Sequence, residues 1–200
     1  MSTYCKSWRS ALARVMLLAA IISLLAPGQP ASAGQTGWNA LKNGTAFVIM
    51  RHALAPGTGD PENFNMDECS TQRNLSDQGR QQARGTGELF RTNGIANAEV
   101  FTSAWCRCRE TAGLLGLGTV RPLEPLNSFF RQRDRRAAQT NALKDWLQTQ
   151  TRDKPLVLVT HQVNITALTG VFPTSGELIF VEIGAGNSVR VIERAVMAAQ

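Results

Sequence analysis

The sequence predicts an α/β fold: a three-layer α/β/α sandwich around a mostly parallel sheet with an antiparallel edge. Short apolar runs of strand length recur along the chain, and segments with helical spacing separate most of them. The last two runs instead follow each other across the segment "GAGN", as in a hairpin. Alternating strands and helices are typical of parallel sheets that helices cover on both faces.

Apolar and β-branched content predicts six strands. The two clearest, 45–50 and 155–160, read as fully buried, and prolines limit a third at 119–126. The remaining expected strands are 98–103 and the hairpin arms "GELIFVEI" and "NSVRVIER".

Four segments are expected to be helical: 76–94, 107–117, 136–151 and 163–170. Ser76 is a good N-cap, and the three glycines inside the first helix suggest close packing or approach to a phosphate. In the third helix, Ala137, Leu143, Trp146 and Leu147 can share one face. Residues 53–74 carry Pro, Gly, Asp and Asn throughout, and therefore read as a long loop.

The first 33 residues have the pattern of a signal peptide. A twelve-residue apolar core follows a positively charged region, and the small residues "ASA" precede the expected cleavage site. That core is short for a membrane span, which needs about 20 residues, although an uncleaved anchor is the alternative. We therefore expect a signal peptide at 1–33, a single domain at 34–200, a periplasmic or secreted location and no stable membrane insertion after cleavage.

Cleavage would remove three basic and no acidic residues, so the net charge would fall from +6 to +3. A mild positive charge suits an anionic substrate without proving one. No Lys/Arg run interleaved with aromatic residues is present, so we expect no nucleic-acid partner.

Three cysteines would remain: Cys69, Cys106 and Cys108. In an oxidising compartment we expect a disulfide from Cys69 to one of the other two, with one thiol left over. A metal site is the alternative, but the Cys-x-Cys spacing does not match the usual ligand pattern and no histidine is spare. We expect no bound metal and no cofactor.

The chain has two histidines, and each follows a predicted buried strand. His52 ends "AFVIMRH" together with Arg51, and His161 ends "PLVLVTH". Arg51 and His52 could instead be a surface-loop pair that follows a strand, and His161 could be a core histidine. In such sheets, however, ligands bind beyond the carboxyl ends of the strands. Two imidazoles at equivalent strand ends therefore predict a site there. Ser103 and Arg107 lie at and just after the end of strand 98–103, which comes between the two histidine strands in the sequence.

This set of residue types suits phosphoryl chemistry. Arginine offers a planar, permanently charged fork to phosphate oxygens. One imidazole can attack phosphorus to form a covalent intermediate, and the other can help to stabilise the transferring group. Neither role requires a metal.

Four motifs, in order, resemble the histidine phosphatase superfamily, in its phosphoglycerate-mutase-like branch. The Arg-His-Gly signature appears as "MRHA", and the helix motif as "LSDQGRQQA" (75–83). The Ser-x-x-x-Arg-x-x-x-Thr-Ala motif appears as "TSAWCRCRETA" (102–112), and the second-histidine segment as "VTHQVNITALTG" (159–170). The resemblance implies a phosphoglycerate-mutase-like fold.

The resemblance implies a role for each matching position. His52 would be the nucleophile that becomes phosphorylated, Arg51 and Arg107 would bind the phosphate, and His161 would be the second pocket histidine. Arg109 falls outside the motif spacing and reads as a solvated helix charge. Gln162 and Asn164 lie near the pocket, and each could either contact the substrate or cap the short helix.

Two positions depart from the family pattern. Ala53 replaces the signature glycine, a small-for-small change. The proton donor to the leaving group is harder to place: Glu124 is the nearest carboxylate and Asp134 the next, yet neither has the usual context. The loop carboxylates are further candidates: Asp60, Glu62, Asp67 and Glu68. Without a positioned acid, the enzyme would need a good leaving group or a water-relayed proton.

The leading hypothesis is a metal-independent phosphatase that hydrolyses phosphate monoesters. A mutase is disfavoured because the chain is short and carries an export signal. The alternative is an exported phosphate- or phosphosugar-binding protein with a non-catalytic pocket. A looser resemblance to the heptose phosphatases of Gram-negative envelopes suggests a small phosphorylated substrate, such as an envelope phosphosugar.

Overall fold

The computed structural model of the protein describes residues 35–197. The predicted signal segment lies outside the described residues, so its cleavage remains a prediction. Within the described range, no helix combines the length and apolar character that crossing a membrane requires.

The centre of the domain is a six-stranded sheet with strand order β3-β2-β4-β1-β5-β6. The first four strands along the chain are parallel, whereas β5 pairs antiparallel with β1 and β6 pairs antiparallel with β5. This confirms the predicted mostly parallel sheet with an antiparallel edge. The strands are β1 (Phe47–Arg51), β2 (Glu99–Thr102), β3 (Val120–Pro122), β4 (Leu156–Thr160), β5 (Leu178–Ile183) and β6 (Val189–Ala195).

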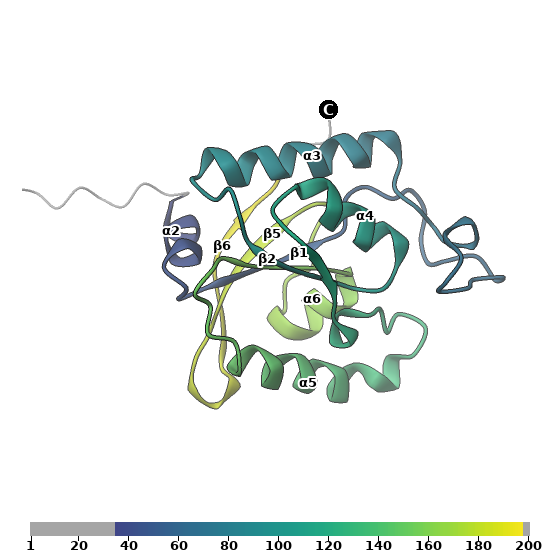
Figure 1. Ribbon diagram of the computed structural model, residues 1–200. Coiled ribbons are helices and arrows are strands. Elements are labelled where there is room, and N and C mark those ends of the chain that lie inside the picture. The colour runs from purple at the N-terminus through teal and green to yellow at the C-terminus, as the bar shows by residue number, and fades with distance from the viewer. Residues whose placement is uncertain (1–34, 198–200) are drawn as a thin grey trace, which may run out of the picture. The chain divides into compact units, whose positions relative to one another are not determined.

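Helices cover both faces of this sheet (Figure 1). The helices are α2 (Thr36–Lys42), α3 (Asp77–Thr92), α4 (Cys106–Leu115), α5 (Arg136–Gln148) and α6 (Gln162–Thr169). Along β1, Val48 and Met50 join the core under α2, α3 and α4, while Phe47 and Ile49 join the core against α5 and α6. Because successive side chains of a strand point to opposite faces, a strand buried on both sides must be apolar at nearly every position. This is the pattern that identified β1 and β4 in the sequence.

Helix α3 follows the long loop and begins as predicted. The Ser76 side chain accepts a hydrogen bond from the Gly79 N–H at 3.0 Å and caps the helix. A Cβ at Gly79 would collide with the Leu54 carbonyl oxygen, and one at Gly87 with that of Leu115. Two of the three interior glycines therefore allow close packing of backbone on backbone, which was one of the two expected reasons for them.

Three details differ from expectation. Helix α2 was not predicted; it covers seven residues and is anchored by buried Trp38 and Leu41. Strand β3 ends at Pro122, well short of the predicted 126, because the chain turns into a 3-10 helix at Glu124–Leu126, with a proline in its first turn. In α5 the buried face holds Gln139 in place of Ala137, which is exposed, and the Gln139 amide donates to the Pro125 carbonyl at 3.1 Å.

Candidate active site

The carboxyl ends of three neighbouring strands form the site. β4 lies between β2 and β1, and backbone hydrogen bonds continue past the last strand residues. The His52 N–H donates to the Thr160 carbonyl at 2.9 Å, and the Ser103 N–H to the Val159 carbonyl at 3.0 Å. The continued ladder holds both histidines in place at adjacent strand ends, where their ring centroids are 5.6 Å apart.

A cavity of about 670 Å³ opens over these strand ends. All four predicted pocket residues line it: Arg51, His52, Arg107 and His161. Loop residues 57–60, Arg73 and Trp105 contribute further walls, and the segment 127–135 forms part of the rim. The structure therefore brings together the residues that the sequence placed in one site.

His52 is held in the tautomer that a nucleophile needs. Its side chain is buried, and Nδ1 lies 2.8 Å from the Ala53 carbonyl oxygen. Because a carbonyl only accepts, Nδ1 carries the hydrogen and Nε2 keeps its lone pair. Burial lowers the pKa of His52 well below its usual range, and the Arg107 charge lowers it further, so the ring is neutral at pH 7.

His161 is buried beside Arg107. The guanidinium Nη2 donates toward His161 Nδ1 at 3.4 Å, so the hydrogen of the neutral ring lies on Nε2, which donates to the Ser103 hydroxyl at 2.8 Å. Burial, then the Arg107 charge, lowers the pKa of His161 well below its usual range. Trp105 packs edge-on against the imidazole ring, and the two ring centroids are 5.1 Å apart.

In the described part of the chain, six arginines line the cavity, and the charges of three of them act on both histidines: Arg51, Arg73 and Arg107. Sequence reasoning missed Arg73, which lies two residues before the "LSDQG" motif. Burial and the neighbouring Arg107 charge lower the pKa of Arg73 to about 10, so it is still a cation at pH 7. Arg73 and Arg51 also bind backbone carbonyls, those of Gly59 and Pro173 respectively, which fixes their side chains at the wall.

Arg107 is paired with a carboxylate. Asp60 from the long loop accepts from its Nη1 at 2.6 Å and its Nη2 at 3.2 Å, a bidentate ion pair. The indole N–H of Trp105 and the backbone N–H of Arg73 also donate to the same carboxylate, at 3.0 and 3.2 Å. A carboxylate therefore occupies the guanidinium edge on which a phosphoryl group would bind.

The other predicted residues lie outside this constellation or at its border. Glu124 is exposed, pairs with Arg135 at 2.6 Å and does not line the cavity. Gln162 lines the cavity, but its amide bonds to the Thr166 hydroxyl. The buried Asn164 amide donates to the Asn127 carbonyl at 2.8 Å, so this residue has a structural role.

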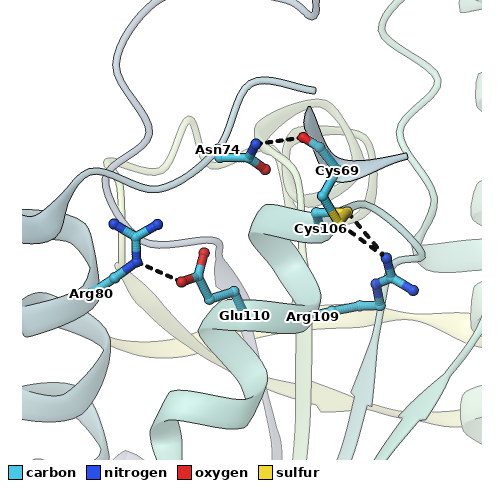
Figure 2. Close-up of a pocket in the computed structure, with 6 residues that line it drawn as sticks. All are labelled: Cys69, Asn74, Arg80, Cys106, Arg109 and Glu110. Atoms are coloured by element: carbon cyan, nitrogen blue, oxygen red, sulfur yellow. Dashed lines mark hydrogen bonds and ion pairs between the residues drawn. A yellow bond between two sulfur atoms is a disulfide. The ribbon is translucent and has the colours of Figure 1, made fainter. Parts of the chain in front are cut away.

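A disulfide joins Cys69 to Cys106 and leaves Cys108 as a buried free thiol. This selects one of the two pairings that the sequence left open. Arg109 is exposed, as expected, and its guanidinium lies against the two disulfide sulfurs (Figure 2). The bridge lines a second, smaller hollow of about 510 Å³ together with the Arg80–Glu110 ion pair. In residues 35–197, no group of three or more His, Cys, Asp or Glu side chains is placed to hold a metal ion.

The two neutral histidines predict a pH-dependent stability. In the unfolded chain each takes up a proton as the pH falls below about 6.5, whereas the folded protein resists this because both folded-state pKa values are lowered. The free energy of unfolding should therefore fall on acidification from pH 6.5 to 5, by up to about 1.4 kcal/mol per pH unit for each histidine. Carboxyl groups with a lowered pKa, such as Asp60, also contribute to the free energy of unfolding, but this contribution is lost only when they are protonated, near and below about pH 4.

Urea unfolding at several pH values in phosphate-free buffer measures this slope. His52→Gln and His161→Gln should each remove about half of it, because the chain has no third histidine. A free energy of unfolding that stays constant over the window would contradict the neutral assignment.

Comparison with known proteins supports this picture. The family model described as the histidine phosphatase superfamily (branch 1) matches residues 47–129, from the start of β1 to the rim of the cavity. No curated protein matches the sequence.

Solved structures share the fold. The protein histidine phosphatase SixA, in complex with tungstate, aligns with a TM-score of 0.56 and 15% identity over 76% of this chain and 96% of SixA. A mycobacterial glucosyl-3-phosphoglycerate phosphatase, in complex with VO3, aligns with a TM-score of 0.55 and 17% identity over 78% of this chain and 100% of that chain.

Proposed function

We propose that this chain is a member of the histidine phosphatase superfamily, whose family model matches residues 47–129, and that it hydrolyses phosphate monoesters through a phosphohistidine on His52. The observation that carries the proposal is the His52 ring: its Nδ1 is hydrogen-bonded to a backbone carbonyl, and it is neutral and surrounded by cations. A neutral imidazole with a free Nε2 is a nucleophile, and the neighbouring cations attract the dianion that it attacks.

In the first step His52 Nε2 attacks phosphorus and the leaving oxygen departs on the opposite side. Arg51, Arg73 and Arg107 would hold the three phosphoryl oxygens and offset the charge that develops on them. His161 can donate from Nδ1 once it is protonated, and an adjacent dianion favours this by raising a histidine's pKa. Water then attacks the phosphohistidine and releases phosphate.

We further propose that the reaction needs no metal, because the guanidiniums already supply positive charge on the phosphoryl group. The rim suits a small anionic substrate with a larger body, such as an envelope phosphosugar. It offers further arginines and two exposed rings: Arg131, Arg133, Arg135, Phe130 and Phe172. A periplasmic or secreted location is supported by the disulfide, since such bonds persist in oxidising compartments.

Turnover of p-nitrophenyl phosphate by the purified domain 34–200 tests the proposal. We expect hydrolysis that EDTA leaves unchanged and that vanadate, an oxyanion like those bound in the two similar structures, inhibits competitively. Arg109→Ala, an exposed cation outside the cavity, is the control and should keep wild-type rates. Vanadate binding without turnover would favour the non-catalytic binding protein instead.

A further inference from the structure

We infer that Asp60 is the proton donor to the leaving group, and that the phosphoryl group frees it for this role by displacing it from Arg107. The inference rests on the proposed phosphatase function and adds to it the acid that the sequence did not place. Among the residues that the structure describes, Asp60 is the one Asp or Glu that lines the cavity.

The first step of the argument is that Arg107 has no free terminal hydrogen. Its Nη1 donates to Asp60 and to the Arg73 carbonyl, at 2.6 and 3.2 Å, and its Nη2 donates to Asp60 and toward His161, at 3.2 and 3.4 Å. Only Nε is left, and it is buried without a partner. A phosphoryl group can therefore gain a forked contact with Arg107 only by taking the place of the Asp60 carboxylate.

The second step is that the displaced carboxylate stays beside the substrate. The backbone around Asp60 is held independently of its side chain: Arg131 donates to the carbonyls of Asp60 and Pro61, and Arg73 to that of Gly59. Gly57 and Gly59 have positive φ angles of 90° and 72°, which gives the preceding segment conformations that other residues avoid. The side chain can thus rotate away from Arg107 while its backbone remains at the cavity wall.

The third step is the change in charge around the carboxyl group. Burial raises the pKa of Asp60, but the hydrogen bond and charge of Arg107 outweigh burial, and the net pKa is lowered. Three cations lie near Asp60: Arg107 pairs with its carboxylate, the charge of Arg73 interacts with it, and Arg131 donates to its backbone carbonyl. A bound dianion takes up the Arg107 and Arg73 charges and adds a negative charge of its own, and both effects raise the carboxyl pKa. Asp60 can then take a proton from solvent.

The proton balance closes over one turnover. As the His52 Nε2–P bond forms and the P–O bond breaks, the carboxyl proton moves to the leaving oxygen, giving an alcohol and the Asp60 carboxylate. In the second step the carboxylate accepts a proton from the attacking water as the N–P bond breaks. Phosphate leaves, and His52 is neutral again. Asp60 returns its proton to solvent, and its carboxylate pairs with Arg107 once more.

The test compares a poor and a good leaving group in Asp60→Asn. A poor leaving group needs protonation, whereas p-nitrophenolate does not. We expect kcat/KM, which reports only the steps up to departure of the leaving group, to fall by at least about 100-fold on glycerol 3-phosphate and to change by less than about 5-fold on p-nitrophenyl phosphate. Asp60→Glu should restore part of the glycerol phosphate activity. Glu124→Gln, an exposed carboxylate outside the cavity, should behave like the wild type on both substrates.

Vanadate affinity gives a second readout. Asp60→Asn should bind vanadate at least as tightly as the wild type does, because the competing charge on Arg107 is gone. An equal loss on both substrates, or weaker vanadate binding, would mean that Asp60 only positions Arg107, and would overturn the inference while leaving the phosphatase function intact. A wild-type protein that hydrolyses neither substrate would instead overturn the proposed function.

Discussion

We expect His52→Ala to lose phosphatase activity by at least about 10⁴-fold in kcat, because covalent catalysis has no substitute when its nucleophile is removed. The protein should remain folded at pH 7. The buried ring makes one hydrogen bond, to the Ala53 carbonyl. Strand β1, which His52 directly follows, is held by apolar packing on both faces. Steady-state kinetics and a circular dichroism spectrum of the same preparation measure both quantities.

Trapping the phosphoenzyme distinguishes the two histidines. Rapid quenching with labelled substrate should yield an acid-labile phosphohistidine in the wild type and none in His52→Ala. The matched variant His161→Gln should still form it, although more slowly, since His161 assists the transfer without bonding to phosphorus. Wild-type turnover in His52→Ala, or label on His161, would contradict the assignment.

The sequence was most informative at the ends of the two buried strands, β1 and β4. β1 and β4 are buried on both faces, so their apolar runs are continuous, and the polar residue that follows each run stands out. Because parallel strands end at the same edge of a sheet, His52 and His161 could be predicted as neighbours without knowledge of side-chain positions. The same reasoning placed Ser103 and Arg107 beside them.

The long loop was where prediction from sequence failed. Residues 53–74 have no periodicity, so nothing in them indicates which side chain folds back into the cavity. Asp60 was one of four loop carboxylates that could not be ranked, and contacts from Arg107 and Trp105 decide its position. Arg73 did have one local signal. It lies three residues before the Ser76 helix cap and two residues before the LSDQG motif that the sequence identified.

The disulfide attaches that loop to α4, so Cys69→Ser should lower both the free energy of unfolding and the activity. The bridge spans a sequence separation of 37 and joins the loop that carries Asp60 and Arg73 to the residue before Arg107. Opening a loop of this length should lower the free energy of unfolding by about 3–4 kcal/mol, chiefly through the entropy of the unfolded chain. The Cys106 N–H also donates to Gln72 at 3.0 Å, so the loop retains one polar tie to α4 when the bridge is lost.

On p-nitrophenyl phosphate, whose leaving group needs no proton from Asp60, the kinetic effect should be larger in KM than in kcat. Arg73 and Asp60 belong to the tethered segment, whereas His52 belongs to the sheet; a looser loop therefore weakens phosphate binding while the nucleophile stays in place. Dithiothreitol should reproduce both changes in the wild type and have no further effect on Cys69→Ser, which serves as the matched control. In the unreduced, denatured domain 34–200, thiol titration should find Cys108 alone. Three reactive thiols there, or a wild type that dithiothreitol does not destabilise, would show that the bridge is absent and that the polar contacts alone hold the loop on α4.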